Sequence, residues 1–79
     1  MDLYEKLNRV CDKESFVAFL KALSNDFETS YSEWQNGSIS SYLECISAWA
    51  VDYKKEDFNW DNPGYKEMAI LFYMGKIYE

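Results

Sequence analysis

The chain has 79 residues and a net charge of −6 from 14 acidic and 8 basic side chains, and it contains three Trp, seven Tyr and five Phe but no His. This length suits a single domain, and the aromatic side chains supply the apolar area that a small core needs, which argues against intrinsic disorder. The negative charge opposes binding to nucleic acid phosphates, and the lack of an apolar run of about 18 residues argues against a membrane span.

The first two elements are predicted to be helices, because apolar residues recur at intervals of three and four. Residues 2–10 form a short amphipathic segment that has to pack against the rest of the chain to be stable. Asp12 is a suitable N-cap for a second helix over residues 13–27. The apolar stripe of this second helix consists of Phe16, Leu20, Leu23 and Phe27, with Val17 widening it and Phe19 off to the side.

A connector and a third helix follow. Residues 28–37 are rich in turn-forming residues, and we expect Tyr31 and Trp34 within them to fold back onto the core. Ser38 is predicted to cap a helix over residues 39–53, where apolar residues show the most regular helical period in the chain. These apolar positions are Ile39, Tyr42, Leu43, Ile46, Trp49, Ala50 and Tyr53.

The last helix is predicted to begin at Pro63, with Asn62 as its cap, and to run to about Tyr78. Its main apolar face consists of Tyr65, Met68, Ala69, Phe72 and Tyr73. Gly75 lowers helix propensity, and we expect it to permit a close helix crossing. The chain is therefore predicted to be one all-α domain over residues 1–79, a small compact bundle of three main helices plus a short N-terminal helix.

The sequence lacks the residues that most enzymes need. Without His, a general base would have to be a carboxylate or a Lys, and no P-loop, GxGxxG or nucleophile elbow is present. Cys11 and Cys45 are expected to be reduced, partly buried thiols, and two Cys without His do not form an ordinary zinc site. We therefore predict that the protein is not an enzyme and uses no catalytic residue, no cofactor and no metal.

Short motifs between Asp12 and Glu79 resemble those of a family of small, acidic, uncharacterised bacterial domains. The most specific motif is Trp34-x-Asn36-x-Ser38-Ile39-x-x-Tyr42-Leu43-Glu44, and the chain ends in Ile77-Tyr78-Glu79. This sequence departs from the family pattern at Tyr65, where Trp is expected, and at Gly75, where Ala is expected. The resemblance supports the fold class and implies no catalytic assignment.

The stretch from Asp52 to Asp61 is the predicted partner-binding site, since segments between helices lie at the surface and often carry recognition. Its candidate residues are Asp52, Glu56, Asp57, Phe58, Trp60 and Asp61. Aromatic anchors surrounded by charge are typical of binding hot spots, although Lys54 and Lys55 dilute the negative charge here. The alternative is that Phe58 and Trp60 pack this stretch onto the bundle.

We expect a binding module for a basic protein, because opposite charges steer association. Small acidic helical immunity proteins or antitoxins that neutralise basic nuclease toxins are one version of this hypothesis. The alternative is a structural or housekeeping domain, including a homo-oligomer. A third hypothesis is a small-molecule pocket lined by Tyr42, Trp49 and Tyr73. The acidic start of the chain is unlike a secretory signal, so a cytoplasmic location is expected, with neither nucleic acid nor membrane as a partner.

Overall fold

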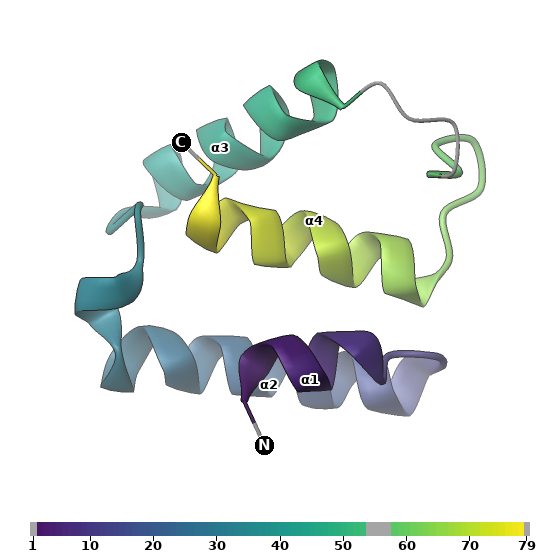
Figure 1. Ribbon diagram of the computed structural model, residues 1–79, viewed down its shortest axis with the longest axis horizontal. Coiled ribbons are helices and arrows are strands. Elements are labelled where there is room, and N and C mark those ends of the chain that lie inside the picture. The colour runs from purple at the N-terminus through teal and green to yellow at the C-terminus, as the bar shows by residue number, and fades with distance from the viewer. Residues whose placement is uncertain (1, 54–57, 79) are drawn as a thin grey trace.

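A computed structural model describes residues 2–53 and 58–78 of the protein (Figure 1). This part of the chain is helical and contains no β-strand. The elements are α1 (Leu3–Asn8), α2 (Lys13–Thr29), the 3-10 turn η1 (Tyr31–Glu33), α3 (Ile39–Asp52) and α4 (Tyr65–Ile77). The predicted all-α bundle of three main helices and one short N-terminal helix is therefore confirmed.

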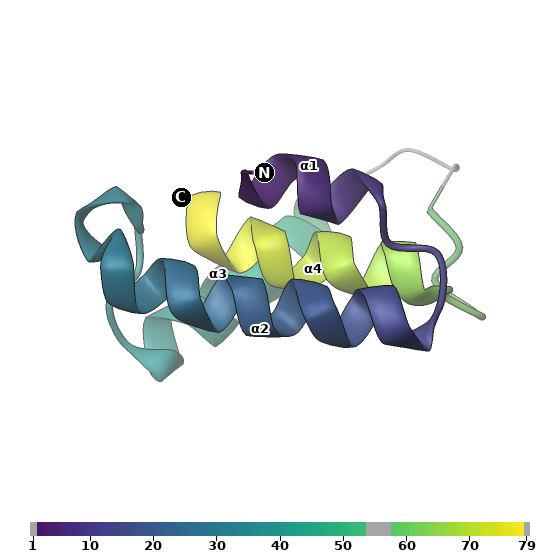
Figure 2. The same ribbon diagram turned by 90° about the horizontal axis from the view of Figure 1, so that it is seen from below.

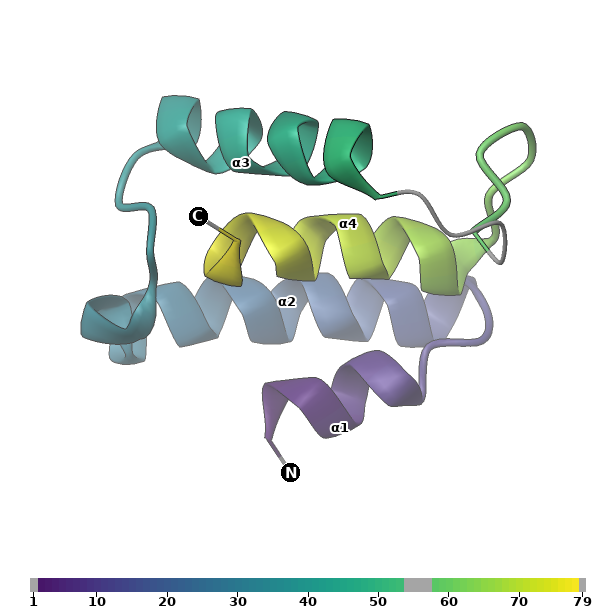
Figure 3. The same ribbon diagram turned by 45° about the horizontal axis from the view of Figure 1, so that its top comes forward.

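The three long helices lie side by side in one layer, with α4 in the middle (Figures 1 and 3). α4 contacts both neighbours, whereas no Cα atom of α2 lies within 8 Å of one of α3. Helix α1 lies on one face of this layer, where it packs on α2 and α4 (Figure 2). The protein is consequently flat, with principal extents of 33 × 27 × 16 Å. Within the described ranges, no second helix covers the opposite face of the layer.

The core lies where α1, α2 and α4 meet. Its buried side chains are Leu7, Val10, Phe19, Leu23 and Ala69. Phe19 lies to the side of the predicted α2 stripe, yet its side chain is only 1% exposed. Phe19 is buried because α1 covers the flank of α2 on which it lies, and the sequence of α2 alone does not show that a helix packs there.

The caps of α1 and α2 are formed by local hydrogen bonds. The Asp2 carboxylate accepts one from the Glu5 N–H at 2.8 Å, and Asp12 accepts one from the Ser15 N–H at 2.9 Å. Ser15 Oγ in turn accepts from the Asp12 N–H at 3.0 Å, which completes a reciprocal cap. These bonds to Ser15 hold the pKa of Asp12 below its usual value. The predicted N-cap of α2 is confirmed, and the helix extends two residues beyond the predicted end.

The start of α4 differs from the prediction. Gly64, rather than Asn62, is its N-cap, and the Gly64 N–H donates to Glu67 Oε1 at 2.7 Å. Asn62 instead donates its backbone N–H to Asn59 Oδ1 at 3.1 Å. The helix begins at Tyr65 because Glu67 reaches back one turn to satisfy the first free N–H group.

Gly75 of α4 packs directly against the ring of Tyr42 on α3. A Cβ atom at this position would lie 2.5 Å from Cε1 of Tyr42, closer than packed carbon atoms come to one another. The Tyr42 hydroxyl donates to the backbone carbonyl of Phe72 at 2.6 Å, which ties α3 to α4. Burial raises the pKa of Tyr42 to about 12.

Candidate functional site

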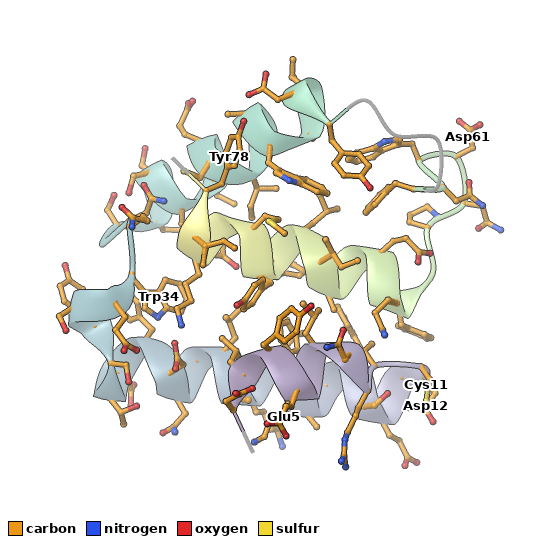
Figure 4. All side chains as sticks on the ribbon, viewed as in Figure 1. Glu5, Cys11, Asp12, Trp34, Asp61 and Tyr78 are labelled. Atoms are coloured by element: carbon orange, nitrogen blue, oxygen red, sulfur yellow. The ribbon has the colours of Figure 1, made fainter. Side chains whose placement is uncertain are left out.

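The connector between α2 and α3 is attached to the end of α4 by a partly buried polar contact. The Trp34 indole N–H and the Lys76 ammonium both donate to the Asp26 carboxylate, each at 2.8 Å (Figure 4). Burial acts to raise the pKa of Asp26, but the hydrogen bonds from Lys76 and Trp34 and the charge of Lys76 outweigh it, so this pKa lies below its usual value. Trp34 folds back onto the bundle as predicted, whereas Tyr31 stays exposed.

A second set of contacts joins the connector to α3 and to the end of the described chain. Asn36 Nδ2 donates to Cys45 Sγ at 3.0 Å and to the Gly75 carbonyl at 3.2 Å. The Cys45 thiol donates to the Tyr78 carbonyl at 2.6 Å. Both cysteines are free thiols, with Cys45 buried and Cys11 exposed. Side-chain contacts therefore hold the connector against α3 and α4.

These contacts build a pocket of about 430 Å³ in the corner where the chain turns from α2 into α3. Its lining residues are Leu20, Leu23, Ser24, Phe27, Glu28, Trp34, Asn36, Gly37, Ser38, Ile39 and Tyr42. We call this feature the α2–α3 pocket. Its lining is mainly apolar, and the polar groups of Trp34, Asn36 and Tyr42 are already hydrogen-bonded within the fold.

Apolar side chains at the mouth of the α2–α3 pocket are exposed. Ile39 is 73% exposed, and Leu43, one helical turn further along α3, is 54% exposed. Ile39 and Leu43 belong to the predicted apolar stripe of α3, but the structure does not bury them. Among the described helices, α4 alone packs on α3, and one neighbouring helix cannot cover a stripe this broad.

Among the described residues, the only charged one that lines the pocket is the acidic Glu28, and Lys21 follows the lining residue Leu20 in sequence. From Ala22 to Tyr53 the chain has no Lys or Arg. The acidic residues in this stretch are Asp26, Glu28, Glu33, Glu44 and Asp52. Asp26 is neutralised by Lys76. Glu28 lines the pocket, and Glu33 and Glu44 are exposed on the connector and on α3. The pocket therefore combines a mainly apolar lining with one carboxylate, that of Glu28.

In the predicted site at residues 52–61, Phe58 is buried instead of exposed. Phe58 is only 7% exposed and packs in a cluster of rings with Trp49, Tyr53 and Trp60, which we call the aromatic cluster. Its ring centroid lies 4.2 Å from that of Trp60 and 5.7 Å from that of Trp49. Phe58 is therefore not an exposed anchor, and the alternative that it packs this stretch onto the bundle is correct. Trp60 remains 43% exposed at the edge of the cluster.

Of the four predicted carboxylates, the structure describes Asp52 and Asp61. Asp52 accepts a hydrogen bond from the Tyr78 hydroxyl, which raises the pKa of Tyr78. Asp61 is exposed (Figure 4), and Glu56 and Asp57 lie outside the described residues. Among residues 2–53 and 58–78, no group of three Cys, Asp or Glu side chains is placed to hold a metal ion. The structure thus brings Phe58 and Trp60 together but places Asp52 against the end of the chain.

Residues 12–79 match a family of unknown function, DUF7660. The chain belongs to the DUF7660 family. The matched segment begins at the N-cap of α2, so α1 lies outside the DUF7660 match, whereas the α2–α3 pocket and the aromatic cluster lie inside it. No curated protein and no solved structure matches the chain. In this DUF7660 domain, none of the described helices is long and apolar enough to cross a membrane.

The α2–α3 pocket was not predicted from the sequence of this DUF7660 domain. Two signals pointed to it: the absence of Lys and Arg from Ala22 to Tyr53, and an apolar stripe on α3 broader than one neighbour can bury. Neither signal places α2 and α3 on opposite sides of α4, which is the arrangement that leaves the pocket open.

Proposed function

We propose that this protein is a protein-interaction domain that binds a basic partner through the α2–α3 pocket. The observation that carries the proposal is an open, mainly apolar pocket whose described lining contains a carboxylate, that of Glu28, and no basic residue. Exposed apolar surface with a polar rim is typical of interaction sites, and the Glu28 carboxylate favours a positively charged partner. A protein partner suits the net charge of −6 as well.

A small molecule is a poorer fit to the same pocket. Small-molecule sites place a few free polar groups to orient the ligand. Here the Tyr42 hydroxyl, the Trp34 indole and the Asn36 amide are used by Phe72, Asp26, Cys45 and Gly75. Of the residues expected to line a ligand pocket, Tyr42 lines the α2–α3 pocket, whereas Trp49 lies in the aromatic cluster and Tyr73 packs against Tyr4 of α1.

The alternative of a homo-oligomer is disfavoured by charge, since each copy has a net charge of −6 and the two copies would repel each other. The immunity- or antitoxin-like version of the proposal names a basic nuclease toxin as the partner. It rests on size and charge balance, and a basic nuclease-like reading frame beside the gene would support it.

The experiment is an affinity purification from the native host with matched baits. Ile39→Ser removes the most exposed apolar side chain of the pocket, and Val51→Ser removes a similarly exposed aliphatic side chain, 68% exposed, elsewhere on α3. We expect the wild type and Val51→Ser to retain a basic protein that Ile39→Ser loses. Burying an Ile side chain contributes about 1.5–3 kcal/mol, so Ile39→Ser should weaken the purified complex about tenfold or more.

Two further results decide between the candidate sites. Equal retention of the partner by Ile39→Ser and Val51→Ser would refute the assignment to the α2–α3 pocket. A Trp60→Ala bait that loses the partner while Ile39→Ser keeps it would assign binding to the predicted site at residues 52–61 instead. Each variant must keep the far-UV circular dichroism spectrum of the wild type, so that a loss of binding is not a loss of folding.

A further inference from the structure

We infer that the partner presents an amphipathic α-helix with Lys or Arg on its flanks, and that this helix lies in the α2–α3 pocket on the face of the layer opposite α1. The inference rests on the proposed function and specifies how the partner binds. It follows from three features of the structure: the spacing of α2 and α3, the hydrogen-bonding state of the pocket, and the distribution of charge.

The spacing of the helices suits one further helix. Packed helices lie about 8–10 Å apart, so α2 and α3, on either side of α4, have axes roughly 16–20 Å apart. A helix with its side chains is about 10–12 Å wide and fits between them above α4. α1 shows how this layer is covered on its other face, where Leu3, Leu7 and Val10 at helical spacing pack on α2 and α4.

The polar groups of the pocket favour a helix over an extended segment. An extended segment would place unpaired backbone N–H and C=O groups against an apolar lining, and each unpaired group that loses water is costly. The N–H and O–H donors of Trp34, Asn36 and Tyr42 are already used within the fold. The other polar side chains of the lining are Ser24, Glu28 and Ser38, too few to pair the backbone of an extended segment. A helix satisfies its backbone internally and presents only side chains to the pocket.

The length of the apolar surface sets the size of the partner helix. On α2 it runs from Val17, which is exposed and precedes the pocket by one turn, to Phe27 inside it. This is about 15 Å along the axis, or roughly three helical turns. On α3, Ile39 and Leu43 lie on the same face one turn apart. A partner helix of about three turns with apolar residues at i, i+4 and i+7 would cover both walls.

The carboxylates beside this surface select a basic helix. Glu28 lines the pocket on the α2 side, and Glu33 is exposed on the connector next to the lining residue Trp34. Lys21 on α2 is the cation nearest in sequence to the lining residues, so the partner helix should not carry Lys beside it. The Lys76 ammonium is held by Asp26 and does not offset the exposed carboxylates.

The test uses a synthetic helical peptide of Leu and Lys, with Leu at i, i+4 and i+7, titrated into the isotope-labelled full chain and followed by NMR. The indole N–H of Trp34 reports on the pocket, and that of Trp60 reports on the aromatic cluster. We expect the Trp34 indole and the amides of Ile39 and Leu43 to shift while the Trp60 indole does not. Three matched arms accompany it: the same peptide with two central prolines, the peptide with Glu in place of Lys, and the Ile39→Ser and Val51→Ser proteins.

The inference expects the proline peptide, the Glu peptide and Ile39→Ser each to weaken binding at least tenfold, with Val51→Ser unchanged. If the proline peptide binds at the same residues as well as the helical one, the helix is wrong while the basic partner of the proposed function stands. If the helical peptide does not bind, or shifts Trp60 instead of Trp34, the inference is overturned, and the native-partner experiment still decides the proposed function. Concentration-dependent dimerisation abolished by Ile39→Ser would identify a second copy as the occupant and overturn both.

Discussion

The contact between Gly75 and Tyr42 predicts that Gly75→Ala destabilises the protein, although Ala is the better helix former. The added Cβ would lie 2.5 Å from Tyr42 Cε1 and 2.8 Å from Cδ1 and Cζ. The Tyr42 ring is held on both sides, by its bond to the Phe72 carbonyl at 2.6 Å and by the Trp34 ring with a centroid distance of 5.8 Å. The substitution therefore has to separate α3 from α4 or displace Tyr42.

The magnitude follows from three opposing effects. Replacing a helical Gly by Ala gains about 1 kcal/mol of helix propensity. Overpacking a well-packed contact costs about 1–3 kcal/mol. Displacing Tyr42 from the Phe72 carbonyl costs about 1 kcal/mol more. The net loss in the free energy of unfolding is about 1–3 kcal/mol, and in a domain of this size each kcal/mol lowers Tm by about 4–8 °C.

Urea denaturation followed by far-UV circular dichroism measures the loss, and Gly37→Ala is its matched control. A Cβ at Gly37 would also meet a tyrosine, the hydroxyl of Tyr31, but Tyr31 is exposed and can turn away. Neither Gly has a positive φ, so backbone strain does not distinguish the two substitutions. We expect Gly37→Ala to change stability by less than about 0.5 kcal/mol. If Gly75→Ala proves as stable as the wild type or more so, the close crossing of α3 and α4 is refuted.

Three further predictions concern other parts of the fold. Trp49→Ala should lower the free energy of unfolding by about 3–5 kcal/mol in urea titrations, because Trp49 is buried at the base of the aromatic cluster, and a loss under about 1 kcal/mol would contradict this. The stability advantage of the wild type over Asp26→Asn should be fully present above the unfolded-state pKa of about 3.9 and disappear as pH falls through the lower folded-state pKa of Asp26. An advantage that does not change with pH would show that the Asp26 charge is not the cause. Trp60→Ala should lower the free energy of unfolding by only about 0.5–1.5 kcal/mol, for its lost ring contact with Phe58. It should leave peptide binding at the α2–α3 pocket unchanged. Weakened binding in the NMR titration would show that Trp60 and the pocket are not independent.

Local sequence was sufficient where a helix end depends on residues within one turn. Asp12 and Ser38 are predicted N-caps because Asp and Ser are preferred at this position. In the structure, each side chain accepts a hydrogen bond from the backbone N–H three residues ahead, at Ser15 and Ser41. The start of α4 was missed, although Glu67 is equally local. The Glu67 carboxylate accepts a hydrogen bond from the Gly64 N–H. Because Gly has no side chain, the residue type at position 64 does not indicate an N-cap.

Burial was predicted well only where the helix neighbours could be inferred. Trp49 and Ala69 lie mid-stripe and are buried, but Phe19 is buried off the main stripe of α2 and Ile39 is exposed on the stripe of α3. The difference is the number of neighbouring helices: α2 is packed by α1 and α4, whereas α3 is packed by α4 alone. Apolar spacing defines which face is apolar and does not define how much of it is covered.

By itself, the sequence determined that this protein is a small all-helical domain with a short docked N-terminal segment, and that Asp12 and Ser38 cap two of its helices. These properties depend on composition and on contacts within one or two helical turns. Only the tertiary structure decided that Phe58 is packed beneath Trp60 and that α4 separates α2 from α3, leaving Ile39 beside an open pocket. Those outcomes depend on which helices become neighbours. The sequence of a single helix does not show which other element, if any, covers its apolar face.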